Sequence, residues 1–183
     1  MTLVNDAAGE DYIIPALPHI ILPTYAPSKI VVVSPIMQEI DAERIASWDV
    51  HLFVDIQGFV RMPNKRFRDV DKLFDLHHLV ERAAVIKAGR EEVARLTPRS
   101  QQALRGTPLL LTGGAAGATL IIDGIEHRIP ADHLDIEHAI GAGDMLLACF
   151  AVQILRGASP VEGAHIASAY VNQVLRSRMN ATG

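Results

Sequence analysis

Short runs of β-branched and other apolar residues alternate along the chain with longer stretches whose apolar residues have helical spacing. The short runs are typical of strands buried on both faces of a parallel sheet, and they lie at 29–34, 51–55, 84–87 and 108–112. The stretches with helical spacing predict helices, over 42–48, 69–83, 91–96, 100–104, 144–156 and 160–176. Strands that alternate with helices predict an α/β fold with right-handed crossovers and a mainly parallel sheet, with helices on both faces.

Two other pairs of short runs predict β-hairpins. Thr2–Val4 and Tyr12–Pro15 flank a turn-rich segment, and prolines at 15, 18 and 23 exclude a helix directly after it. Ala118–Ile122 and Glu126–Ile129 flank Asp123-Gly124, a dipeptide typical of a two-residue hairpin turn.

Composition narrows the class of protein. The 183 residues are 49% hydrophobic and 21% charged, which predicts one globular domain, 1–183. A net charge of -4 without a basic run argues against a nucleic-acid partner. No apolar run approaches the roughly 20 residues that span a bilayer, and the N-terminus does not resemble a signal peptide, so no membrane partner is expected. The single cysteine, Cys149, excludes an internal disulfide and favours a cytoplasmic location.

A turn of three small residues, Gly141, Ala142 and Gly143, stands directly before Asp144 and an apolar stretch that continues to Leu155. Glycine lets a backbone approach a ligand closely. The free amides and the dipole at the N-terminus of a helix form an anion site, and Asp144 adds a potential base. The alternative is that Asp144 only caps the helix, which would stabilise it by about 1 kcal/mol.

The stretch Gly141–Val174 resembles the C-terminal signature of the ribokinase-like (PfkB) carbohydrate kinases. Gly-Ala-Gly-Asp is followed by an apolar helix that ends at Leu155-Arg156-Gly157 and by an alanine-rich helix from Pro160. The chain departs from the family pattern at His138 and Ala139, where Asp or Asn and then a small hydroxyl residue or Pro are usual.

The resemblance implies a ribokinase-like three-layer α/β/α fold and an ATP-dependent phosphotransferase. Such an enzyme transfers the γ-phosphoryl group to a hydroxyl of a sugar, polyol or nucleoside. Asp144 is then implied to accept the hydroxyl proton, and the amides of Gly141, Ala142 and Gly143 to form the anion hole. ATP and Mg²⁺ are the implied cofactors, with a monovalent cation as an optional third.

A second glycine-rich segment, Thr112–Gly117, follows the fourth predicted strand. It resembles the family's Thr-x-Gly-x-x-Gly loop, which implies that Thr112 lies near phosphate and that Gly114 and Gly117 lie near the nucleotide. It is not a Walker A loop, because no Lys-Ser/Thr follows, and the alternative is a plain hairpin turn. In the family the last helix borders the adenine pocket, which implies that Asn172 contacts the base. We expect this loop and the Asp144 turn to form one pocket.

Acidic residues follow the third predicted strand. The family carries Asn-x-x-Glu here, and its Glu orders water around Mg²⁺; in this chain Gly89 replaces the Asn and Glu92 keeps the Glu. The alternative is that Glu92 simply favours a helix N-terminus. Ser34–Glu39 and Asp55–Gly58 resemble loops that lie beside the substrate in some members, or they are ordinary strand-to-helix turns.

Family members are usually much longer, and their N-terminal portion supplies further strands, a substrate loop and a β-sheet lid. We therefore expect the C-terminal part of such a kinase, truncated at the N-terminus, with residues 1–27 as a remnant of the lid or a connecting hairpin. A missing N-terminal portion or a second copy in a homodimer would cover the sheet edge left open. Two alternatives stay open: a non-catalytic nucleotide-binding or dimerisation remnant, and a structural α/β domain without a ligand.

Overall fold

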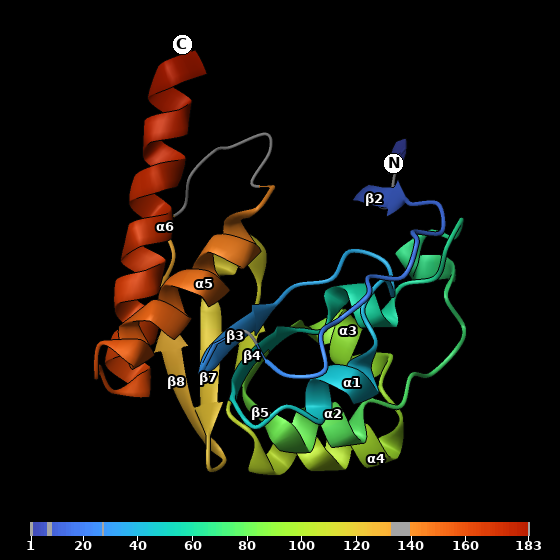
Figure 1. Ribbon diagram of the computed structural model, residues 1–183. Helices are drawn as coiled ribbons and strands as arrows, with labels where there is room; N and C mark the ends of the chain where they lie inside the picture. The colour runs from blue at the N-terminus through green and yellow to red at the C-terminus, as the bar shows by residue number, and fades with distance from the viewer. Residues whose placement is uncertain (1, 7–8, 27, 133–139, 183) are drawn as a thin grey trace.

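A six-stranded sheet separates two layers of helices in the computed structural model, which describes residues 2–6, 9–26, 28–132 and 140–182 (Figure 1). The strands are β3 (Ile30–Val33), β4 (His51–Asp55), β5 (Ala83–Gly89), β6 (Leu109–Thr112), β7 (Ala118–Ile122) and β8 (Ile125–Ile129), in that order. The strands β3 to β6 are parallel, and β7 and β8 continue the sheet antiparallel. The predicted α/β fold with a mainly parallel sheet is confirmed.

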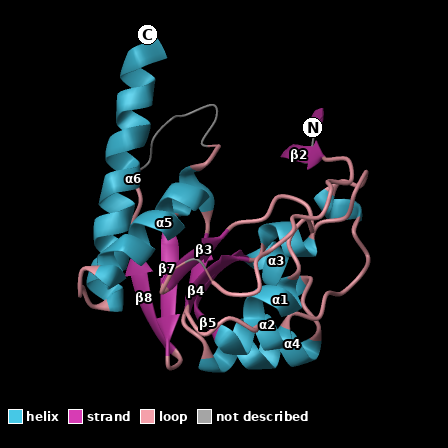
Figure 2. Cartoon of the chain, in the orientation of Figure 1, coloured by secondary structure: helices cyan, strands magenta, loops and turns pink. Residues whose placement is uncertain are grey.

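The helices divide between the two faces (Figure 2). One layer holds α5 (Ala142–Leu155) and α6 (Pro160–Thr182). The other holds α1 (Ala42–Ala46), α2 (His77–Arg82), α3 (Arg90–Ala94) and α4 (Pro98–Ala103). Short 3₁₀ turns are η1 (Gln57–Val60), η2 (Phe67–Asp69), η3 (Leu104–Gly106) and η4 (Gly114–Ala116). The predicted N-terminal hairpin forms a separate two-stranded sheet, β1 (Thr2–Asp6) and β2 (Gly9–Ile13).

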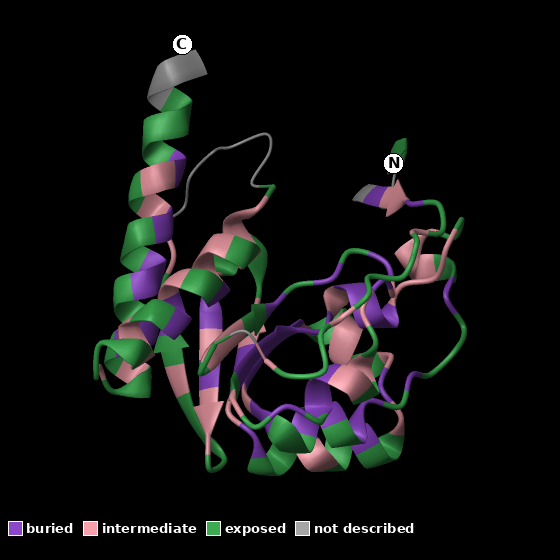
Figure 3. Ribbon diagram, viewed as in Figure 1, coloured by how far each residue is buried: buried purple, intermediate pink, exposed green. Residues whose placement is uncertain are grey.

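Alternation along the central strands gives each helical layer its own apolar core (Figure 3). In β4, Leu52 and Val54 join the cluster under α1 to α4, whereas Phe53 joins the cluster under α5 and α6, as the two-residue period of a strand requires. Phe53 meets Phe150 of α5 edge to face, with ring centroids 6.0 Å apart. Both faces of the sheet are therefore buried, which explains the nearly continuous apolar runs in the sequence.

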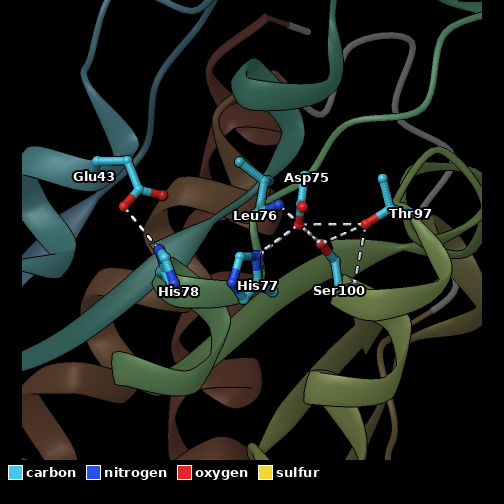
Figure 4. Close-up of polar contacts among 7 residues, drawn as sticks. All are labelled: Glu43, Asp75, Leu76, His77, His78, Thr97 and Ser100. Carbon is cyan, nitrogen blue, oxygen red and sulfur yellow. Dashed lines mark hydrogen bonds and ion pairs between the residues drawn. The ribbon is translucent and has the colours of Figure 1, made fainter.

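The helix predicted over 69–83 is wrong in its first half, because α2 begins only at His77. Phe74 instead forms a parallel bridge with Leu96: its N–H donates to the Arg95 carbonyl at 2.8 Å, and its carbonyl accepts from Thr97 N–H at 2.9 Å. The Asp75 carboxylate then accepts the backbone N–H and ring Nδ1 of His77, at 3.2 and 2.9 Å (Figure 4). Val70, Phe74 and Leu76 are thus buried by an extended segment instead of a helix, whereas Leu73 is exposed.

The remaining predicted elements lie close to the observed ones. Asp123 and Gly124 have φ angles of 51° and 76°, which agrees with the predicted hairpin turn. Within the described residues, β3 is an outer strand of the large sheet, and Val32 is 40% exposed. A search of the same residues finds no helix with the length and apolar character that a membrane crossing requires.

Candidate active site

The N-terminus of α5 brings the predicted anion-hole residues onto one turn. Gly141 is the N-cap, with a left-handed φ of 82° that favours glycine. Met145 N–H donates to the Gly141 carbonyl at 3.0 Å. The amides of Ala142, Gly143 and Asp144 precede that bond and belong to the first turn, where no intrahelical acceptor exists. Asp144 is not the N-cap, and no side chain caps this helix, so capping does not account for Asp144.

Asp144 faces the carboxyl end of β3. The hydroxyl of Ser34, which directly follows that strand, donates a hydrogen bond to Asp144 Oδ1 across 110 positions of sequence. Both residues are exposed. An alcohol O–H therefore reaches this carboxylate. The loop after β3, whose residues 34–39 resemble a substrate loop, thus contributes Ser34 to the candidate site.

A buried ion pair lies beneath the same turn. Lys87 and Asp55 are aligned in the parallel register of β5 and β4, and Lys87 Nζ donates to Asp55 Oδ2. The two residues are 6% and 1% exposed. A Cβ atom added at Gly143 would lie 2.8 Å from Lys87 Nζ, so glycine at this position lets the ammonium pack against the helix turn. No sequence motif marks this lysine; a charged residue within a buried strand, opposite an aspartate on the next strand, is the signal that could have found it.

Glu92 lies beside this ion pair. Its Oε2 accepts the Gly89 N–H at 2.7 Å, so a backbone amide holds the carboxylate where the family pattern has an Asn. Burial raises the pKa of Glu92 and the Asp55 charge raises it further, against the Gly89 hydrogen bond and the charges of Lys87 and Arg61, which lower it. A group of three or more His, Cys, Asp and Glu residues able to hold a metal ion is not found in the described part of the chain.

Two cavities flank the loop after β6, and both are lined by Arg90, Thr112 and Gly113. The smaller one, about 310 Å³, extends toward β7 and β8. The larger one, about 680 Å³, is also lined by Glu92 and Arg61. This places Thr112 and Glu92 around one cavity, as the carboxyl edge of a parallel sheet predicts.

The glycine loop is also a tight turn. Gly113 N–H donates to the Gly117 carbonyl at 2.8 Å, and the Thr112 hydroxyl donates to the Ala88 carbonyl at 3.3 Å. Gly117 has a φ of 87°, and a Cβ there would lie 2.5 Å from the Ile129 carbonyl oxygen. Packing against β8 therefore accounts for Gly117 without a ligand. Gly114, with a φ of 58°, has open space beside it and lines the larger cavity.

Some predicted site residues are not brought together. Among the described residues, Gly141–Asp144 and Asn172 line neither of the two cavities, so the common pocket of the two glycine segments stays a prediction. Asn172 is half-buried on α6. His138 and Ala139 lie outside the described residues.

Solved structures of several kinases have a similar fold. The chain is similar to ribokinase from Thermotoga maritima (TM-score 0.61, 15% identity, covering 81% of this chain and 50% of that one). It is similar to a pyrophosphate-dependent kinase in the ribokinase family (TM-score 0.73, 21% identity, covering 93% of this chain and 66% of that one). It is also similar to the nucleoside kinase of Methanocaldococcus jannaschii (TM-score 0.63, 16% identity, covering 83% of this chain and 52% of that one). The predicted ribokinase-like fold is confirmed.

Sequence comparison adds one relative. A 60-residue stretch is 40% identical to the bifunctional protein HldE of Caulobacter sp. (strain K31), which covers 32% of this chain and 12% of that protein. No family model matches the chain. The chain spans between 50% and 66% of the length of the solved structures named above.

Proposed function

We propose that this chain is the C-terminal part of an ATP-dependent phosphotransferase of the ribokinase (PfkB) family, with residues 1–27 as a remnant of the lid or a connecting hairpin. It would transfer the γ-phosphoryl group to a hydroxyl of a sugar, polyol or nucleoside. The observation that carries the proposal is the Ser34 hydroxyl bound to Asp144 at the N-terminus of α5. This hydrogen bond brings an alcohol hydroxyl against the proposed base, next to the proposed anion site at the N-terminus of α5.

In this proposal the acceptor hydroxyl takes the place of the Ser34 hydroxyl. Asp144 accepts its proton while the acceptor oxygen bonds to the γ-phosphorus and ADP leaves. The first-turn amides of α5 stabilise the charge on the transferring group. The Lys87 ammonium, held by Asp55 against Gly143, adds a buried positive charge behind that turn.

The residues present fit a magnesium ion that is held mainly by donor phosphates. Glu92, close to the loop after β6 and held by the Gly89 amide, is the protein group that would contact it through a water molecule. When bound, the ion offsets the negative charge of the donor phosphates.

Asp144→Asn tests the proposal. The amide keeps the size of the side chain but cannot accept the proton, so we expect transfer to fall about 10²–10⁴-fold. The melting temperature and its rise with ATP should stay similar to the parent. The assay is ADP release from ATP and Mg²⁺ with a panel of sugars, polyols and nucleosides, and slow transfer is expected from a chain of this length. The control, Asp123→Asn, removes the same charge at the exposed β7–β8 turn and should keep the parent rate.

A second candidate is a non-catalytic nucleotide-binding or dimerisation module. Two observations favour it: Ser34 already occupies the Asp144 carboxylate, and Gly89 stands where the family has an Asn. Stabilisation by ATP without transfer to any acceptor supports this second candidate. A transfer rate that survives Asp144→Asn contradicts the assignment of the base.

A further inference from the structure

The loop after β3 holds Ser34 in a defined position against Asp144. Glu39, which is 7% exposed, accepts the Ile36 N–H at Oε1 and the Met37 N–H at Oε2, at 2.7 and 2.6 Å. One buried carboxylate therefore fixes two consecutive peptide groups of the loop. The strand that precedes Ser34 packs against α5 (Figure 1), so both ends of the Ser34–Asp144 hydrogen bond belong to fixed elements.

The same loop packs closely against the turn after β4. A Cβ atom added at Gly58 would lie 2.1 Å from the Pro35 carbonyl oxygen. Gln38, with a left-handed φ of 54°, donates its N–H to the Gly58 carbonyl at 3.0 Å. The Ser34 hydroxyl is thus already ordered at the carboxylate, and this ordering is what makes transfer between two groups of one chain effective.

The hydroxyl of Ser34 has the arrangement of an activated nucleophile. Other hydroxyl groups donate to backbone carbonyl groups, as Thr112 does to Ala88 and Ser168 to Pro130. Ser34 instead donates its one proton to a carboxylate. Because the side chain is exposed, the lone pairs of its oxygen remain accessible for attack on a bound donor.

We propose that Ser34 is itself a phosphoryl acceptor, so that the chain phosphorylates its own serine when no small acceptor is bound. The inference rests on the proposed function, because it uses the same base and the same donor. The Ser34 oxygen bonds to the γ-phosphorus of ATP as the bond from that phosphorus to the β–γ bridging oxygen breaks. ADP leaves with that electron pair, and the Ser34 proton passes to Asp144.

The reaction stops at one phosphoryl group per chain. In the product, the serine oxygen no longer carries the proton that it donated to Asp144. The phosphate brings about two negative charges to this position, which the N-terminus of α5 favours and the Asp144 carboxylate opposes. A second transfer would need another hydroxyl at the same carboxylate, and the modified loop fills that place.

The test is mass spectrometry of the full 183-residue chain after incubation with ATP and Mg²⁺ and without an added acceptor. Trypsin releases residues 30–44, in which Ser34 is the sole serine, threonine or tyrosine, so a phosphoryl group on this peptide identifies the site. We expect labelling to approach one phosphoryl group per chain. The rate per chain should not change on dilution, because each serine reaches its own Asp144.

Three variants sharpen the test. Ser34→Ala should lose the label from residues 30–44, and Asp144→Asn should slow labelling about 10²–10⁴-fold. The control is Ser28→Ala, which removes another exposed hydroxyl before β3 and should keep the parent rate.

The outcomes separate this inference from the proposed function. If the parent chain transfers phosphate to an added acceptor, yet residues 30–44 stay unlabelled without one, the inference fails and the proposed function stands. Labelling that keeps its rate in Asp144→Asn, or whose rate per chain rises with protein concentration, overturns the intramolecular transfer. If neither Ser34 nor any added acceptor is phosphorylated, both fail.

Discussion

Two carboxylate clusters, one at the starts of α2 and α4 and one at the carboxyl ends of β4 and β5, use similar residues for different ends. In the Asp75 network, formed by Asp75, His77, Thr97 and Ser100, one carboxylate oxygen accepts four hydrogen bonds (Figure 4). Hydrogen bonds from His77 and then Ser100 lower the pKa of Asp75 to about 2. In the edge cluster, formed by Asp55, Lys87 and Glu92, burial instead raises the pKa of Glu92.

The difference separates a structural cluster from a functional candidate. In the Asp75 network, the carboxylate accepts hydrogen bonds from His77 at the start of α2, from Ser100 of α4 and from Thr97, the N-cap of α4. It therefore fixes where these two helices begin. The edge cluster holds charge in a buried position next to a cavity and a free helix N-terminus. A carboxylate whose pKa is raised by burial beside a cavity is the kind of perturbation that marks a functional site. Carboxylates with many partners are therefore not by themselves evidence of a site.

The largest expected effect comes from breaking the buried pair. Lys87→Met leaves the Asp55 carboxylate buried without its cation, and we expect the free energy of unfolding to fall by about 3–5 kcal/mol. Removing both charges, in Asp55→Asn with Lys87→Met, should restore part of that loss. Urea denaturation measures all three proteins, and a single variant as stable as the parent would show that the pair is not buried.

A smaller effect is expected in the Asp75 network. Ser100 is fully buried, and its hydroxyl accepts the Leu76 N–H at 2.8 Å and donates to Asp75. Ser100→Ala leaves that amide without a partner, so the free energy of unfolding should fall by about 1–3 kcal/mol. Binding of ATP should not change. The control is Ser177→Ala on the exposed face of α6, for which we expect the free energy of unfolding to change by less than about 0.5 kcal/mol. A loss of ATP binding in Ser100→Ala would contradict the purely structural role of the Asp75 network.

The smallest effect is on pH dependence, and it has opposite sign in the two clusters. Because the pKa of Glu92 is raised on folding, its ionisation opposes folding, and stability is lost as pH rises through that raised pKa. Glu92→Gln should therefore melt a few degrees higher than the parent at pH 7 and equally at pH 4. Asp75 has a folded pKa of about 2 against a usual 3.8. Its ionised carboxylate therefore stabilises the fold above pH 3.8, and this stabilisation is lost as the pH falls toward 2.

For Asp75→Asn we therefore expect a lower melting temperature than the parent at pH 7, with the two curves converging in acid. Thermal melts between pH 7 and pH 2 measure both variants. If the melting temperatures of Glu92→Gln and the parent differ by the same amount at every pH in this range, burial does not disfavour the charged form of Glu92.

Local patterns predicted most of the fold, and contacts between distant segments account for what they missed. The strands were predictable because runs such as 29–34 are short, β-branched and apolar. The segment before His77 was not, because Phe74 and its apolar neighbours satisfy helical spacing while a bridge to Leu96 holds them extended. The Asp144 turn was predictable from four consecutive residues. The Lys87–Asp55 pair joins residues 32 positions apart, and only the register of two strands brings them together.

The outer position of β3 has a consequence for how the protein behaves in solution. A parallel strand at a sheet margin presents one row of backbone N–H and C=O groups to its surroundings, and here that row belongs to a run of four valine and isoleucine residues without a proline. Such a row is a template for strand addition between identical molecules. We therefore expect the protein to stay monodisperse when dilute and to associate through this edge when concentrated. Light scattering should then rise with protein concentration and should not depend on salt.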